Sequence, residues 1–201
     1  MPPAAFLDRD GTLIAEVNYL ARPDQVVVLD GVVEALLALR TAGYLIILVS
    51  NQAGVARGFF TMADVTAVNA HLEALLGVAF DGVYVCPHHP AGVVPEYAIA
   101  CDCRKPGDSL LRRALNEHDI DVEGSFIAGD KASDVDAGRA LGIPGYLVMT
   151  GHAEVAKGYH RFTDLADVVE AVLDGKGGIT RRTELLSLRG DKHVKIRRRR
   201  P

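Results

Sequence analysis

Hydrophobic and polar positions along this chain follow two alternating patterns, one typical of buried strands and one typical of amphipathic helices. Short, nearly continuous apolar runs are separated by longer segments in which apolar residues recur at helical spacing. A continuous apolar run indicates a strand covered on both faces, as in a parallel sheet. We predict strands at residues 5–7, 44–49, 82–85, 125–128 and 146–149 and helices at residues 31–42, 61–76, 108–118, 133–141 and 164–173.

Strand and helix alternate five times, which predicts an α/β fold with a doubly wound, parallel, Rossmann-like sheet and helices on both faces. Asp30 is expected to cap the first helix and Gly43 to end it, while Thr61 and Asp64 are expected to cap the second. The mostly irregular segment 15–30 is expected to form a small flap over the end of the first strand. The sequence contains no large inserted cap domain.

The composition is that of an ordinary soluble globular protein, with 49% hydrophobic and 24% charged residues in a chain of 201. No charged start precedes a long apolar segment, and no apolar run reaches membrane-spanning length. We therefore expect no signal peptide, no membrane association and a cytoplasmic location.

The C-terminal segment differs from the rest of the chain in charge. Nine Lys or Arg residues and two acidic residues lie between Arg181 and Pro201, which gives this segment a charge of +7 and leaves -11 on residues 1–180. We expect a globular domain at 1–178 and a basic tail at 179–201. Such a tail can bind nucleic acid, but it contains no interleaved aromatic residue, so a solvated terminus on a monomer without nucleic-acid partners is favoured.

Two carboxylates follow the first predicted strand directly. Side chains of an extended segment alternate, so Asp8 and Asp10 are expected to project together while Arg9 points away from them. Two close carboxylates repel each other unless a cation lies between them, and an oxygen-rich site suits magnesium. The alternative is an ordinary turn, because Asp and Gly11 are common turn residues.

Polar residues also follow two other predicted strands. Ser50 and Asn51 end the second strand, and Asp130 and Asp134 follow the fourth. Ligands of doubly wound sheets bind beyond the carboxyl ends of the strands, which lie at one edge. The sheet is therefore expected to bring these residues together with Asp8.

All three cysteines of the chain lie in one loop that is rich in Pro and Gly. Cys86 and His88 precede Cys101 and Cys103 by a spacer of twelve residues. Two such pairs provide three thiolates and one imidazole, which is a tetrahedral ligand set for structural zinc. His89 is the competing imidazole, and small buried thiols are the alternative to a metal site.

The segments DRDGT, Ser50-Asn51, Lys105 and GDKxxD occur here in the order that is typical of the haloacid dehalogenase (HAD) superfamily of phosphotransferases, which this chain resembles. The resemblance implies that Asp8 is the nucleophile that forms an aspartyl-phosphate and that Asp10 is the general acid and base. It also implies that Ser50 and Lys105 stabilise the transferring phosphoryl group.

The same resemblance implies a magnesium ion held by Asp8, by the backbone carbonyl of Asp10 and by Asp130. Lys131 would orient a carboxylate or contact phosphate. Asp134 would support the metal ligands or replace one of them.

The zinc loop narrows the resemblance to the D-glycero-D-manno-heptose-1,7-bisphosphate 7-phosphatase family, through LDRDGT, SNQAGVARG, CPHHP, CDCRKP and GDKASD within residues 5–175. This resemblance implies a magnesium-dependent phosphatase in heptose biosynthesis, acting on a small sugar bisphosphate. It assigns Arg104 to the distal phosphate and Tyr19 and Asn51 to substrate binding. The alternatives are a histidinol-phosphate phosphatase, a nucleic-acid 3′-phosphatase and a zinc-stabilised binding module.

Overall fold

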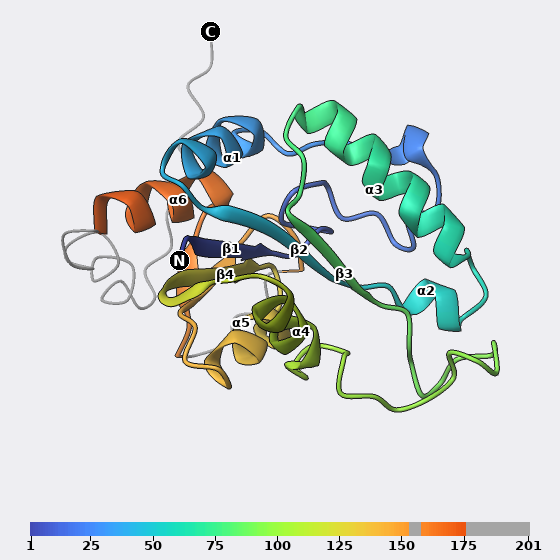
Figure 1. Cartoon of the computed structure of the whole chain (residues 1–201). Helices are drawn as coiled ribbons and strands as arrows, with labels where there is room; N and C mark the ends of the chain where they lie inside the picture. Colours follow the sequence, from blue (N-terminus) through green and yellow to red (C-terminus); the bar gives the residue numbers. More distant parts are fainter. Residues whose placement is uncertain (153–157, 176–201) are drawn as a thin grey trace, which may run out of the picture.

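A six-stranded parallel sheet forms the centre of the molecule (Figure 1). The computed structural model describes residues 1–152 and 158–175. Within this part of the chain the strand order is β3-β2-β1-β4-β5-β6. The strands are β1 (Pro3–Leu7), β2 (Leu45–Asn51), β3 (Gly82–Cys86), β4 (Asp121–Gly129), β5 (Gly145–Val148) and β6 (His160–Phe162). The order reverses beside β1, and the carboxyl end of such a reversal point is where this type of sheet binds ligands.

Helices cover both faces of the sheet (Figure 1). The helices α1, α3 and α6 pack on one face, and α4 and α5 pack on the other. Their bounds are α1 (Val32–Thr41), α2 (Ala53–Ala56), α3 (Met62–Leu76), α4 (Ser109–Glu117), α5 (Ala132–Arg139) and α6 (Leu165–Asp174), with a short 3-10 helix at Pro23–Gln25. None of the helices in the described part of the chain has both the length and the apolar character needed to cross a membrane.

The central strand β1 shows why the apolar runs are continuous. Ala5 and Leu7 belong to the hydrophobic cluster under α1, α3 and α6, whereas Ala4 and Phe6 belong to the cluster under α4 and α5. All four side chains are fully buried. A strand with helices on both faces needs apolar residues at every position, because successive side chains point to opposite faces.

The predicted doubly wound parallel sheet is confirmed, and no large cap domain is inserted among the described residues. The elements that were not predicted include β6 and α2. β6 has three residues at the sheet edge, two of them the polar His160 and Arg161, so it lacks the apolar run of a central strand. The helix α2 is a single turn of four residues, too short to show helical spacing.

The predicted helix ends were partly right. Thr61 and Asp64 form the expected reciprocal cap, since the Thr61 Oγ1 accepts the Asp64 N–H at 3.2 Å and the Asp64 carboxylate accepts the Thr61 N–H at 2.7 Å. The prediction that Asp30 caps the first helix is wrong. The capping residue is Gly31, whose φ of 77° is a left-handed conformation and which has no capping side chain.

The segment 15–30 forms the expected small flap. It contains only the short 3-10 helix, and its ends are pinned by hydrogen bonds from Ala15 N to Val27 O and from Leu29 N to Leu13 O. The predicted domain boundary at residue 178 and the basic tail at 179–201 lie outside the described residues, so they stay predictions.

Candidate active site at the carboxyl ends of the strands

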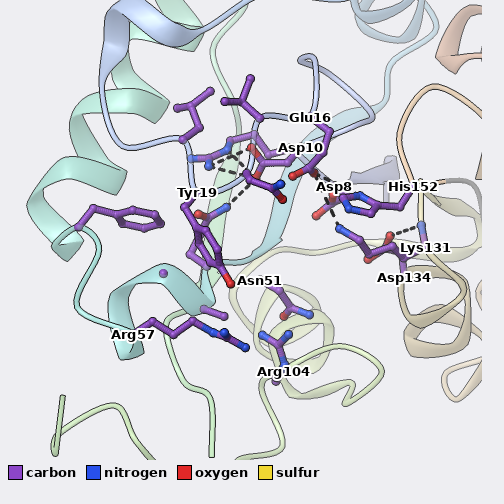
Figure 2. Close-up of a pocket in the computed structure, with 18 residues that line it drawn as sticks. Asp8, Asp10, Glu16, Tyr19, Asn51, Arg57, Arg104, Lys131, Asp134 and His152 are labelled. Atoms are coloured by element: carbon purple, nitrogen blue, oxygen red, sulfur yellow. Dashed lines mark hydrogen bonds and ion pairs between the residues drawn. The ribbon is translucent and has the colours of Figure 1, made fainter. Parts of the chain in front are cut away.

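A cleft of about 220 Å³ lies beyond the carboxyl ends of the strands. It is lined by the loop after β1, the flap, the segment from Asn51 through α2, and residues that precede α4 and α5. Figure 2 shows Asp8, Asp10, Asn51, Lys131 and Asp134 in this one region, although they are far apart in the sequence. The expected convergence of polar residues from separate strand ends is therefore observed.

Lys105 is the buried cation of the site, with 1% of its side chain exposed. Its Nζ donates to the Asp8 Oδ1 at 2.7 Å and to the Val49 carbonyl at 2.6 Å, and it pairs with the Asp134 Oδ1 at 2.8 Å. Burial alone would lower the pKa of Lys105, but the carboxylates of Asp134 and Asp8 outweigh it and raise this pKa. Lys105 therefore remains charged at neutral pH and holds Asp8 in one orientation.

Asp130 is fully buried beside this cluster, and only one of its two carboxylate oxygens accepts a hydrogen bond. Its Oδ2 accepts the His152 N–H at 2.7 Å, but its Oδ1 has no hydrogen-bond partner. Burial raises the pKa of Asp130, and the nearby carboxylate of Asp8 contributes to the increase. Carboxylate oxygens of Asp8, Asp130 and Asp134 lie within 4.8 Å of one another. A buried set of oxygen donors that includes a carboxylate atom without a hydrogen bond fits a hard divalent cation such as magnesium.

Gly11 allows the backbone to approach Asp130 closely. A Cβ at this position would lie 2.6 Å from the Asp130 Oδ2, and the φ of +80° at Gly11 is a conformation that other residues rarely adopt. The glycine of the DRDGT segment is thus needed both for the turn after β1 and for space beside the carboxylate.

Asp10 is held by two neighbours that donate to its carboxylate. The Gln52 Nε2 donates to the Asp10 Oδ2 at 2.7 Å and also to the Ser50 Oγ at 2.8 Å. Arg9 pairs with Asp10 at 3.0 Å and donates to the Asn69 Oδ1. The prediction that Arg9 points away from Asp10 is wrong, because β1 ends at Leu7 and the chain turns at Arg9, so strand alternation no longer applies.

Asn51 connects the end of β2 to the backbone of Lys105. Its Nδ2 donates to the Lys105 carbonyl at 3.1 Å, and its Oδ1 accepts the Lys105 N–H at 3.0 Å. Both polar atoms of this side chain therefore have partners, although the residue also lines the cleft. Asn51 therefore holds the backbone of Lys105 in place and so sets the position of the buried lysine side chain.

We expect Asn51→Ala to lower the free energy of unfolding by about 1–3 kcal/mol, because two hydrogen bonds at a partly buried peptide are lost. Urea denaturation measures this change. The matched control is Asn116→Ala on the exposed face of α4, where we expect a change within about 0.5 kcal/mol. Equal stability of the Asn51 variant and the wild type would contradict the bridging role.

The four predicted zinc ligands converge in the loop after β3. The Cys103 Sγ lies 3.1 Å from the Cys86 Sγ, 3.2 Å from the Cys101 Sγ and 3.2 Å from the His88 Nδ1. Ligands that surround zinc tetrahedrally at ~2.3 Å lie roughly 3.8 Å apart, so this cluster needs only a small expansion. Burial and the neighbouring sulfurs of Cys86 and Cys101 raise the pKa of Cys103. The donor set fits zinc.

His88, and not His89, is the imidazole of this cluster. The ring of His89 lies instead beside Arg57, with 3.4 Å between the His89 Nε2 and the Arg57 Nη2. The loop continues from Cys103 into Arg104 and Lys105. The group of four zinc ligands is therefore adjacent in sequence to the buried lysine.

The remaining predicted substrate-binding residues, Tyr19, Arg104 and Lys131, also line the cleft. Tyr19 adopts a positive φ of 57° in the flap, and its ring packs edge-on against Phe59 at a centroid distance of 4.5 Å. The Lys131 Nζ lies 3.9 Å from Glu16 and 3.8 Å from Asp130. Their roles toward a substrate stay predictions.

Glu16, Gln52, Arg57 and His152 are among the cleft residues that sequence reasoning did not assign to the site. Gln52 and His152 follow the ends of β2 and β5, so the strand-end rule could have found both. Glu16 belongs to the flap, whose path the sequence does not predict. The signal for Arg57 was its place in the SNQAGVARG segment.

Comparison with known proteins agrees with this geometry. Residues 102–174 match the family model of HAD-hydrolase-like proteins. The D-glycero-beta-D-manno-heptose-1,7-bisphosphate 7-phosphatase of Yersinia pestis is 39% identical over 178 residues, which cover 85% of this chain and 95% of that protein. The enzyme of the same name from Pasteurella multocida is 44% identical over 155 residues, covering 75% of this chain and 84% of that protein.

Among solved structures, the D,D-heptose 1,7-bisphosphate phosphatase from B. bronchiseptica, complexed with magnesium and phosphate, superposes with a TM-score of 0.75 at 30% identity. The match covers 86% of this chain and 98% of that one. Similarity of this extent across more than four fifths of the length of each named relative establishes the family. The chain belongs to the D-glycero-D-manno-heptose-1,7-bisphosphate 7-phosphatase family of HAD-like phosphoric monoester hydrolases.

Proposed function

We propose that this protein is a magnesium-dependent phosphatase that removes the 7-phosphate of D-glycero-D-manno-heptose 1,7-bisphosphate in heptose biosynthesis. The observation that carries the proposal is the buried cluster of Asp8, Lys105 and Asp134 beside the unpaired oxygen of Asp130. The names of the relatives from Y. pestis and P. multocida support the substrate and favour its β anomer.

Asp8 is the nucleophile in this proposal. The Lys105 Nζ at 2.7 Å from the Asp8 Oδ1 holds its carboxylate in place, and a carboxylate oxygen can attack phosphorus. A bond forms between a carboxylate oxygen and phosphorus while the bond from phosphorus to the sugar oxygen breaks. The product of this step is an aspartyl-phosphate, which water then hydrolyses.

Asp10 supplies a proton in the first step and removes a proton in the second. It first protonates the leaving sugar oxygen and then accepts a proton from the attacking water. Hydrogen bonds from Gln52 and Arg9 orient its carboxylate toward the cleft. Ser50 donates to a phosphoryl oxygen, and its Oγ accepts from Gln52 at 2.8 Å, which leaves the hydroxyl proton available for that contact.

Asp8, the backbone carbonyl of Asp10 and Asp130 would hold the magnesium ion, with Asp134 behind them. When bound, magnesium neutralises charge on the phosphate and draws it toward the nucleophile. This assignment is supported by the magnesium and phosphate in the B. bronchiseptica structure. Cys86, His88, Cys101 and Cys103 would hold a structural zinc ion that orders the loop leading to Lys105.

On the substrate side, we assign Arg104 to the distal phosphate and Tyr19, Asn51 and Lys131 to further substrate contacts, since all four line the cleft. The expectations of a cytoplasmic monomer that binds neither nucleic acid nor membranes stay predictions.

The proposal is tested by measuring phosphate release with magnesium from both anomers of heptose 1,7-bisphosphate, from fructose 1,6-bisphosphate and from histidinol phosphate. Substrates must be compared by kcat/KM. We expect the β-heptose bisphosphate to exceed the other three by at least about tenfold, since one discriminating polar contact is worth this factor. A preference for histidinol phosphate would retain the mechanism but refute the substrate.

A further inference from the structure

Arg57 lies at the end of the cleft that is distant from the carboxylate cluster. It directly follows the one-turn helix α2, and its backbone N–H donates to the Ala53 carbonyl at 3.1 Å. Figure 2 shows the guanidinium groups of Arg57 and Arg104 turned toward each other, with Asn51 and Tyr19 between them and the carboxylates. Two arginines from separate loops thus meet at one end of the substrate cleft.

Both of these arginines have buried N–H groups without partners. Within residues 1–152 and 158–175, neither the Arg57 Nε nor the Arg104 Nη1 has a hydrogen-bond partner, and neither side chain lies within 4.0 Å of a carboxylate. Other arginines of this part of the chain do form ion pairs, namely Arg9, Arg22, Arg40, Arg112, Arg113 and Arg139. Unpaired buried donors with a positive charge are costly unless an anion binds to them.

The imidazole of His89, which lies beside Arg57, adds no negative charge. The His89 Nε2 lies 3.4 Å from the Arg57 Nη2. An imidazole carries no negative charge, so among the described residues the two guanidinium groups at this end of the cleft have no anionic partner. The opposite end, around Asp8 and Asp130, is rich in carboxylates.

Aromatic packing holds the Arg57 side chain in the cleft. Its guanidinium lies over the Tyr19 ring at 5.8 Å from the centroid, and Tyr19 in turn packs on Phe59. A guanidinium that is stacked on one face still presents its planar edge, which is the edge that binds two phosphate oxygens at once.

We propose that Arg57 is a specificity-determining residue that binds the distal phosphate of the substrate together with Arg104. The inference rests on the proposed function, which supplies a substrate with two phosphates, and it adds a residue to the single arginine assigned above. A phosphate dianion placed between two guanidinium groups balances their charge and satisfies the unpaired N–H groups. Substrates without a distal phosphate leave both arginines unpaired, which is how the cleft selects bisphosphates.

The test is Arg57→Gln, assayed with β-heptose 1,7-bisphosphate and with the corresponding 7-monophosphate, which lacks only the distal group. We expect kcat/KM for the bisphosphate to fall roughly 10- to 100-fold, mainly through KM, because charge-assisted hydrogen bonds are lost. The kcat/KM for the monophosphate should stay within about twofold of the wild-type value, because this substrate does not make the lost contact. Arg57→Lys should recover part of the loss, since it restores charge without the planar fork.

Arg112→Gln on α4 is the matched control, because Arg112 is exposed and paired with Asp108 outside the cleft. Zinc content and thermal stability of each variant are measured alongside. Equal losses on both substrates, or a loss of zinc, would show a structural role through Tyr19 and His89 and overturn the inference alone. A wild-type enzyme without preference for the bisphosphate over the monophosphate would overturn the proposed function as well.

Discussion

Replacement of Asp8 by Asn is expected to lower kcat by at least about 10⁴-fold, because the neutral amide cannot attack phosphorus to form the covalent intermediate. The substitution keeps the size of the side chain and leaves Lys105 its second carboxylate, Asp134, at 2.8 Å. The protein should therefore still fold. The measurements are steady-state phosphate release, the melting temperature and the zinc content.

Asp24→Asn is the control for this experiment. Asp24 lies on the flap, and it is exposed and paired with Arg22 at 3.0 Å. At this exposed position, the same change from carboxylate to amide should leave kcat within about twofold of the wild-type value, because most surface substitutions have small effects. If Asp8→Asn retained turnover above a few per cent while Asp24→Asn behaved like the wild type, Asp8 could not be the nucleophile.

The second large effect is expected at the zinc cluster. Cys101→Ser removes one of the four ligands, and structural zinc sites contribute several kcal/mol to folding. For a chain of this size, a loss of about 4 kcal/mol corresponds to a fall of roughly 10 °C in melting temperature. Activity should fall as well, because the loop that carries Arg104 and Lys105 begins at Cys103. Zinc is measured by mass spectrometry of metals in the purified protein.

His89→Gln is the control for the zinc site, since His89 neighbours the ligand His88 but has its ring beside Arg57. This variant should keep one zinc per chain and the melting temperature of the wild type. A Cys101→Ser protein with full zinc content and unchanged stability would refute the assignment, as would loss of zinc from His89→Gln.

These two variants, each compared with its control, also distinguish the effects of the magnesium site from the effects of the zinc site. Asp8→Asn should leave zinc in place, whereas Cys101→Ser should affect both stability and turnover. The coupling runs in one direction because the cysteine loop leads into Lys105, which Asn51 then anchors to the sheet. The zinc cluster thus supports the position of the buried lysine without lining the cleft itself.

Much of this architecture was predictable because the hydrophobic pattern of each segment matches the position of that segment in the sheet. Continuous apolar runs identify the five longer strands, since a strand between two helical layers must be apolar at every position. Once those strands are parallel, their carboxyl ends share one edge, so Asp8, Asn51 and Asp134 had to meet. The spacing of three cysteines and His88 likewise predicts one cluster, because each pair projects two ligands from one short segment.

Other features depend on contacts between segments that sequence order does not connect. Arg9 pairs with Asp10 because the chain turns directly after β1, which ends at Leu7 as predicted, so strand alternation does not extend to Arg9. Gln52 joins Asp10 to Ser50 only because β1 and β2 are neighbours in register. The cap at Gly31 and the edge strand β6 follow from local backbone geometry and pairing and have no strong compositional signal.

The sequence by itself therefore determined the fold class, the edge of the sheet that carries the site and the loop that carries the zinc cluster, because these follow from periodicity and spacing along one segment. Only the tertiary structure decided which charges are paired. It placed Lys105 between Asp8 and Asp134, left an oxygen of Asp130 without a hydrogen bond, and brought Arg57 to Arg104 without a carboxylate. The physical reason is that pairing depends on distances of a few ångströms between side chains from different loops, and these distances exist only after the sheet and its helices have packed.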